Sequence, residues 1–296
     1  VAVKMLHPGL TGEAELKRIL AEGKSLASLS HANVVKVHRL GSHEGRPYIV
    51  MEYLDGRTLA ALRREQAMPL RQCLELMHQV ALGLQAIHAM GILHRDLSTH
   101  NIMVTSAGTA KILDLGLSRD MSRLTTTDSR GALLGTLAYV APEHIAGEAA
   151  SVRSEVFAFG VILYEVLAGE NPFKAEHYMS LLYNITQREP APIEERVPDC
   201  PPALARLVRE CLAKRPDVRP RDMSEVARRL AALLAASGPA GAHGAALPAV
   251  TATRRAPPRN PYLNRVMIKN PTDFIGRQQE VKRVFFTSST GVYAQQ

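Results

Sequence analysis

Tryptophan is absent from the 296 residues, aromatic residues make up only 5% of them, and cysteine occurs three times. Cys73, Cys200 and Cys211 are odd in number and show no paired C-x-x-C spacing, which argues against a disulfide framework and against a zinc site. No secretory signal is visible. The cysteine pattern favours a reducing compartment, and we therefore expect a cytoplasmic protein.

Long runs of large hydrophobic residues are also missing. Residues 230–253 contain no Lys, Arg, Asp or Glu, so they have to be considered as a membrane span. Ten of them are Ala, three are Gly, and Pro239 and Pro248 interrupt the run. Few large aliphatic side chains are left to drive insertion, so we interpret the run as a linker and expect no membrane span in the chain.

The excess of positive charge is unevenly distributed. The net charge is +8, but residues 231–296 hold eight Lys or Arg and only Asp273 and Glu280, so this tail carries about +6. The rest of the chain carries about +2, which gives no evidence that it binds a specific nucleic acid. We expect a solvated, flexible tail, and an anionic partner for the tail stays an alternative.

Apolar periodicity predicts the elements of the chain. Residues 70–90 repeat apolar positions at helical spacing, and residues 156–167 are apolar almost all round, as in a buried helix. Shorter patterns predict the remaining elements. These are helices at 204–212 and 223–234, strands at 34–40 and 48–52, and a hairpin of 102–104 with 111–113.

Four short motifs occur in one order along the chain. Val1-Ala2-Val3-Lys4 comes first, then His94-Arg95-Asp96-Leu97 with Asn101, then Asp114-Leu115-Gly116, and finally Ala141-Pro142-Glu143. Each motif alone is weak, since an aspartate before glycine is an ordinary turn and a lone histidine is usually a core residue. Together, at this spacing, they indicate a phosphoryl-transfer site of the protein-kinase type.

The chemistry of phosphoryl transfer explains these residue types. The transferred group carries spread negative charge, which the protein must position and neutralise. Asp114 and Asn101 are the predicted ligands of Mg²⁺ or Mn²⁺, since hard cations prefer oxygen ligands. Asp96 would accept the proton of the attacking hydroxyl. Lys4 would hold the α- and β-phosphates of ATP, and Glu22, on a predicted helix, would hold Lys4 in place.

With these motifs the chain resembles the bacterial branch of the eukaryotic-like serine/threonine protein kinases over about residues 1–230. The resemblance implies an α+β, two-lobed fold with an incomplete, small, β-rich N-lobe that includes helix C, and a mainly helical C-lobe. We assign 1–54 to the partial N-lobe and hinge and 55–234 to the C-lobe. Residues 235–260 form an Ala/Gly/Pro/Arg linker, and 261–296 form a tail.

The resemblance also implies an adenine site. Met51 matches the gatekeeper position, and the hinge from Glu52 to Leu54 would meet adenine through its backbone groups. Ala2 and Met103 would lie on the two faces of the adenine ring. These positions come from the match to the family and not from periodicity or spacing.

Further positions follow from the same resemblance. Glu143 and Arg219 are expected to form a buried ion pair that ties the activation segment to the end of the C-lobe. Thr136 and Tyr139 resemble the substrate-docking loop of serine/threonine kinases, and His94 has a structural role.

The segment between Asp114 and Glu143 is rich in hydroxyl side chains. We predict Thr125, Thr126 and Thr127 as an autophosphorylation cluster, because phosphate there would pair with Arg95 and order the segment. The alternative is that the hydroxyls are simply loop composition.

Three departures from the family pattern bear on activity. The chain begins inside the third strand of the N-lobe without an initiator Met, so the Gly-rich loop over the phosphates is missing. We therefore expect a fragment with weak or no turnover. Ser98 stands where the family usually has a lysine for the γ-phosphate. Glu155 stands where a shorter Asp usually braces the catalytic loop, so we expect a displaced brace.

The C-terminal tail carries one weak motif. Phe274-Ile275-Gly276-Arg277, with Glu280, resembles the lead-in to the P-loop domain of AAA and STAND-type ATPases. A truncated second domain and a disordered tail both stay open.

The predicted function is transfer of the γ-phosphate of Mg-ATP to Ser or Thr hydroxyls of proteins, in bacterial signalling. The alternative is a pseudokinase, or a nucleotide-binding regulatory module of a larger signalling ATPase. Protein substrates are the expected partners, and a fused C-terminal ATPase or sensor region is a further possibility.

Overall fold

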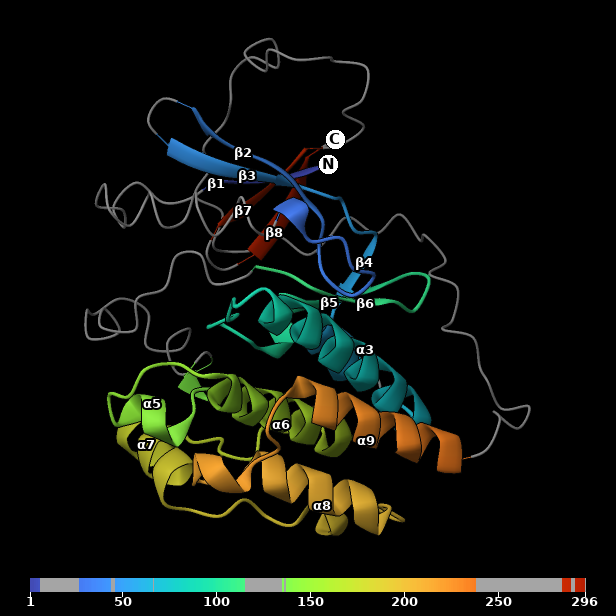
Figure 1. The fold of residues 1–296 in the computed structure, drawn as a ribbon, viewed down its shortest axis with the longest axis vertical. Helices are drawn as coiled ribbons and strands as arrows, with labels where there is room; N and C mark the ends of the chain where they lie inside the picture. Colours follow the sequence, from blue (N-terminus) through green and yellow to red (C-terminus); the bar gives the residue numbers. More distant parts are fainter. Residues whose placement is uncertain are drawn as a thin grey trace.

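The computed structural model has a small β-sheet region followed by a mainly helical region, which confirms the two-lobed α+β fold (Figure 1). The structure describes residues 1–5, 27–43, 46–65, 67–114, 135, 137–237, 284–288 and 291–295. Glu22, Thr125, Thr126, Thr127 and Thr136 lie outside these ranges.

The first sheet has the strand order β2-β3-β1-β7-β8. β1 (Ala2–Met5) pairs antiparallel with β3 (Arg46–Met51), which pairs antiparallel with β2 (Val37–His43). On its other edge β1 pairs in parallel with β7 (Val284–Ser288), which forms a hairpin with β8 (Gly291–Gln295). The strands nearest the site are therefore β1 and β3, and their register sets Ala2 opposite Met51.

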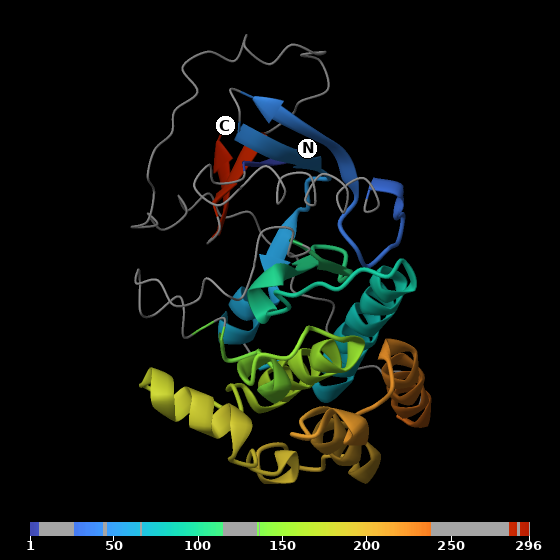
Figure 2. The ribbon, with the colours of Figure 1, turned by 60° about the vertical axis from the view of Figure 1, so that its left-hand side comes forward.

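A second, three-stranded sheet lies between the first sheet and the helices (Figures 1 and 2). Its order is β4 (Gly56–Thr58), β5 (Ile102–Thr105) and β6 (Ala110–Ile112), all antiparallel. The β5–β6 hairpin is the one that the sequence predicts. It places the catalytic loop directly before β5 and Asp114 directly after β6.

The helical region is built around two long helices, α3 (Leu70–Ala89) and α6 (Val152–Ala168). α6 begins with a capping box between Ser151 and Ser154, and it ends at Gly169 with φ 80°, a left-handed conformation that glycine adopts without a steric cost. The predictions at 70–90 and 156–167 are confirmed.

The shorter helices surround this pair. α9 (Met223–Ala236) packs on α3, and α8 (Pro202–Cys211) packs on α6. The others are α2 (Leu59–Glu65), α5 (Pro142–Ile145) and α7 (Tyr178–Thr186), with 3-10 turns η2 (Thr99–Asn101), η4 (Ile193–Glu195) and η5 (Pro216–Val218).

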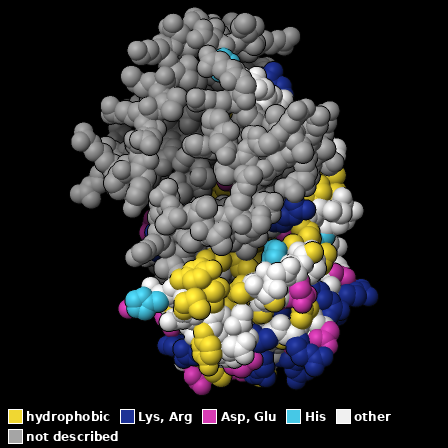
Figure 3. Space-filling model, turned by 90° about the vertical axis from the view of Figure 1, so that its left-hand side faces the viewer, with side chains coloured by type: hydrophobic (Ala, Val, Ile, Leu, Met, Phe, Trp, Pro, Cys, Tyr) yellow, Lys and Arg dark blue, Asp and Glu magenta, His cyan; other side chains and the backbone are white. Residues whose placement is uncertain are grey.

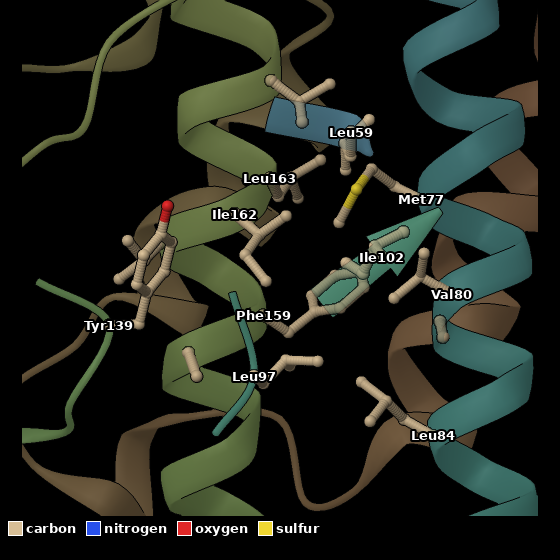
Figure 4. Close-up of a cluster of buried hydrophobic side chains, with 14 of the residues drawn as sticks. Leu59, Met77, Val80, Leu84, Leu97, Ile102, Tyr139, Phe159, Ile162 and Leu163 are labelled. Carbon is tan, nitrogen blue, oxygen red and sulfur yellow. The ribbon is translucent and has the colours of Figure 1, made fainter. Parts of the chain in front are cut away.

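The core between α3 and α6 supports the catalytic loop. Phe159 of α6 points toward Met77 and Val80 of α3, with Ile102 of β5 and Leu97 of the catalytic loop beside it (Figure 4). All five side chains are buried. Because the loop contributes Leu97 to this packing, the position of the catalytic loop is coupled to the rigid core.

One helix leaves large apolar side chains on the surface. Tyr178, Met179 and Tyr183 of α7 are 44%, 71% and 62% exposed. Hydrophobic side chains gather on the lower part of the face that carries α7 (Figure 3).

Candidate active site

Asp114 and Lys4 meet in the region between the two sheets. Lys4 lies on β1, and its Nζ is 2.9 Å from Oδ1 of Asp114. Asp114 has φ 48°, so its backbone is in the left-handed region that non-glycine residues rarely adopt. The two side chains are 15% and 25% exposed, which leaves both of them accessible to a ligand.

The catalytic loop is fixed from inside by His94. This side chain is fully buried, its Nε2 donates to the carbonyl of Leu113 at 2.8 Å, and its Nδ1 accepts from the backbone N–H of Asp96 at 3.3 Å. The two contacts select one tautomer, since Nδ1 must be the acceptor. His94 thereby joins the loop to the residue that precedes Asp114.

Asn101 holds the side chain of Asp96. Its Nδ2 donates to the carbonyl oxygen of Asp96 at 2.7 Å and to Oδ2 of Asp96 at 3.1 Å. The backbone carbonyl of Asn101 also accepts from the N–H of Leu113 at 2.8 Å. The amide nitrogen is thus used within the protein, and the amide oxygen is the group of Asn101 that suits a metal ion.

The donor set around Asp114 and Asn101 fits a hard divalent cation. A carboxylate and an amide oxygen are the oxygen donors that Mg²⁺ accepts when phosphate oxygens and water complete its coordination. Within the described ranges no cluster of three or more His, Cys, Asp or Glu forms a site that holds a metal by itself. The residues therefore fit a metal that arrives with a nucleotide.

Glu155 of α6 braces the catalytic loop from below. Its Oε1 accepts from the backbone N–H of Arg95 at 2.7 Å, and its Oε2 accepts from Nε2 of His88 at 2.6 Å. Arg95 has φ 62°, so the carboxylate stabilises a strained backbone position. The expectation of a displaced brace was wrong, because the longer Glu155 side chain keeps its bond to the loop.

Ser98 lies in the catalytic loop two residues after Asp96. It has an extended backbone and is only 6% exposed. A hydroxyl in this position supplies no positive charge for a γ-phosphate. The departure that the sequence shows is therefore also a departure in the electrostatics of the site.

The predicted adenine positions flank the connection between the lobes. Ala2 and Met51 are buried neighbours across β1 and β3, and Leu54 is buried at the end of the hinge. Met103 lies on β5 and is half-buried. Glu52 also uses its side chain, since its Oε1 is 2.6 Å from Nζ of Lys111.

Arg219 and Glu143 form the buried pair that the resemblance implies. Nη1 and Nη2 of Arg219 lie 2.7 and 2.8 Å from the two carboxylate oxygens, a bidentate geometry. The guanidinium also donates to the carbonyls of Ala213, Arg153 and Lys214.

A polar network around Tyr139 was missed by the sequence reasoning. The hydroxyl of Tyr139 donates to Oε2 of Glu165 at 2.6 Å and lies 2.9 Å from Oγ1 of Thr99, while Arg63 pairs with Oε1 of Glu165 at 2.7 Å. Burial, together with the neighbouring Glu165 carboxylate, raises the pKa of Tyr139. A lone glutamate in the otherwise apolar segment 156–167 was the available signal, because a buried carboxylate requires partners.

Comparisons with known proteins agree with this geometry. The family model described as "Protein kinase domain" matches residues 1–229. The serine/threonine-protein kinase PknA of Mycobacterium tuberculosis (strain ATCC 25618 / H37Rv) is 34% identical over 246 residues, which cover 81% of this chain and 56% of that protein. Serine/threonine-protein kinase PknB of Mycobacterium leprae (strain TN) is 33% identical over 232 residues, covering 76% of this chain and 37% of PknB.

A third relative extends the comparison to another bacterial group. The probable serine/threonine-protein kinase PknB of Lactococcus lactis subsp. lactis (strain IL1403) is 32% identical over 229 residues, covering 76% of this chain. The chain therefore spans only 36% to 56% of the length of these three relatives. Among the described residues, no helix is both long enough and apolar enough to cross a membrane.

Proposed function

Since the chain belongs to the protein kinase domain family, we propose that it transfers the γ-phosphate of Mg-ATP to Ser or Thr hydroxyls of protein substrates. The observation that carries the proposal is the convergence of Asp96, Asn101, Lys4 and Asp114 on one site, with Lys4 and Asp114 2.9 Å apart. The matched relatives bear the names of serine/threonine-protein kinases.

Each residue of the site has a defined task. Asp96, oriented by Asn101, aligns the acceptor hydroxyl and takes its proton. Lys4 binds the α- and β-phosphates, which requires it to give up part of its contact with Asp114. Mg²⁺ held by Asp114 and Asn101 would neutralise negative charge on the phosphates. His94 and Glu155 hold the loop that carries Asp96.

Ser98 is the reason for considering a second function. Without a cation at this position, one contribution to charge stabilisation in the transition state is missing, and a single donor of this kind is worth about 3 kcal/mol. A pseudokinase that binds nucleotide and regulates a partner is therefore the alternative. The two functions differ in whether phosphate transfer depends on Asp96.

The test is transfer of labelled phosphate from ATP to a generic basic protein and to the chain itself. We expect transfer by a form of the chain that is completed at its N-terminus with a Gly-rich loop, and we expect Asp96→Asn in that form to abolish transfer while Mg-ATP binding is retained. Asp217→Asn is the matched control, because Asp217 is an exposed aspartate of η5 that has no part in the proposed site. Binding without Asp96-dependent transfer would establish the pseudokinase instead.

Other aspects of the function stay predictions. The cytoplasmic location rests on the cysteine pattern, and the bacterial signalling role rests on the relatives. The ATPase-like lead-in at 274–277 lies outside the described residues and beyond the family match, which ends at residue 229. The autophosphorylation cluster also lies outside the described residues.

A further inference from the structure

The carboxylate of Glu52 lies where three segments of the chain meet. Its Oε1 accepts from the backbone N–H of Lys36 at 2.8 Å and from Nζ of Lys111 at 2.6 Å. In return, the backbone N–H of Glu52 donates to the carbonyl of Lys36 at 2.9 Å. One side chain of the hinge is thereby joined to the segment before β2 and to β6.

Lys111 belongs to the strand that leads to the metal site. It lies opposite Met103 in the β5–β6 register, and Asp114 follows it by three residues. Its neighbour Ile112 is hydrogen bonded on both sides, since its N–H donates to Asn33 and its carbonyl accepts from Val35, both at 2.9 Å. A displacement of Lys111 should therefore also displace Asp114, because the strand between them is held by hydrogen bonds.

The ion pair between Lys111 and Glu52 is partly shielded from solvent, so it can hold the two segments in place. The side chains of Lys111 and Glu52 are 17% and 25% exposed, so water screens their attraction less than it screens the fully exposed pairs of this protein. Neither side chain has a role in the proposed transfer step. Their contact needs an explanation that the catalytic residues do not supply.

We propose that Lys111 is a positioning residue for the nucleotide. Through Glu52 it fixes the separation between the hinge backbone, which meets adenine, and Asp114, which meets the metal and the phosphates. The inference rests on the proposed function, because it assumes that one ligand spans the hinge and Asp114. The ligand concerned is a nucleoside triphosphate with its divalent cation.

This role predicts that the effect depends on the length of the ligand. Mg-ATP engages both ends of the site, so a preset separation lowers the cost of binding it. Adenosine engages the hinge end alone and has nothing to gain from the separation. Loss of the contact between Lys111 and Glu52 should weaken the binding of Mg-ATP and leave the binding of adenosine nearly unchanged.

The experiment measures dissociation constants for Mg-ATP and for adenosine by titration calorimetry, with thermal midpoints measured in parallel. For Lys111→Met we expect roughly fivefold weaker binding of Mg-ATP, which corresponds to about 1 kcal/mol. The dissociation constant for adenosine should change by less than about twofold. Lys111→Arg, which keeps the charge, should recover most of the lost affinity.

Two further variants make the interpretation specific. Lys36→Met removes the same charge from an exposed neighbouring side chain while its backbone N–H still serves Glu52, so it should leave both constants unchanged. The double variant Lys111→Met with Glu52→Gln should be no weaker for Mg-ATP than Lys111→Met alone, because the two residues act as one pair.

The outcomes separate this inference from the proposed function. Equal weakening of Mg-ATP and adenosine, or no weakening of either, would overturn the positioning role. Binding of Mg-ATP without phosphate transfer by the N-terminally completed form would overturn the catalytic function, and the comparison of Mg-ATP with adenosine would still test the positioning role. A wild-type chain that binds neither ligand would overturn both.

Discussion

Two pairs of opposite charge in this molecule are constructed in contrasting ways. Arg219 and Glu143 are almost fully buried and bidentate, and the remaining donors of the guanidinium are taken up by backbone carbonyls. Among the residues that the structure describes, Lys4 and Asp114 are joined by one ion pair, and both side chains are partly exposed.

The difference shows how the same type of interaction serves structure or function. A pair whose hydrogen-bonding groups are all used within the protein holds two segments together and has nothing left to offer a ligand. A pair with one contact keeps ammonium N–H groups and carboxylate lone pairs free for phosphate and metal. Burial and the number of partners therefore distinguish the two roles.

Breaking the saturated pair should have the largest effect on stability. Arg219→Met leaves Glu143 buried without its counter-charge, so the free energy of unfolding should fall by about 3–5 kcal/mol. Denaturant titration measures the loss. The control is Arg215→Met, whose ion pair with Asp217 is fully exposed to solvent and should contribute far less to stability. Similar losses in both variants would contradict the contrast.

An intermediate effect is expected in the Tyr139 network. Tyr139→Phe removes the hydroxyl that donates to Glu165 and leaves Arg63 as the remaining partner of the buried carboxylate among the described side chains, so unfolding should become easier by about 1–3 kcal/mol. Tyr48→Phe is a matched control, because the Tyr48 hydroxyl has an exposed partner in Arg39. Thermal or chemical unfolding of the two variants should differ clearly, and equal behaviour would argue against a structural role for the network.

A smaller effect on stability, which depends on pH, is expected at the partly exposed cap of α9. Asp222 caps α9 by accepting from the N–H of Glu225 at 3.0 Å, and its pKa is lowered to about 2, first by the Ser224 hydroxyl. Asp222→Ala should cost about 1 kcal/mol at pH 7. Because the folded-state pKa is below the unfolded value, this stabilisation is complete above about pH 4 and is lost as the pH falls through 2. Unfolding of both proteins across this range checks the sign, and a cost that grows on acidification would refute it.

The smallest effect on stability should accompany a large effect on activity. Within the described part of the chain, Lys4→Met breaks one partly exposed ion pair, so the free energy of unfolding should change by less than about 1 kcal/mol. Phosphate transfer should fall by roughly a hundredfold or more, because a charge aimed at the phosphates is removed. A variant that is strongly destabilised would show that Lys4 belongs with the structural pairs.

The sequence was sufficient for the elements whose pattern is local. The helices at 70–90 and 156–167 and the hairpin before Asp114 follow from periodicity, and the structure confirms them. Among the elements the structure describes, α2 and α7 were not predicted, since both helices are short.

The site was predictable as far as motifs define it. Lys4 and Asp114 are far apart in sequence, and only the resemblance placed them together. Contacts that depend on three-dimensional reach were not predictable, as with Glu155, whose extra methylene was expected to displace the brace. The reach of a side chain depends on the position of its partners, which periodicity does not specify.

The bond between Glu155 and His88 has an evolutionary consequence. Glu155 accepts hydrogen bonds from Arg95 and His88 at once, so the shorter Asp at this position would lose one of these bonds unless α3 shifted as well. In a lineage that carries glutamate here, positions 88 and 155 should drift together and rarely apart. An alignment of homologues that differ at position 155 would then show two distant columns changing together.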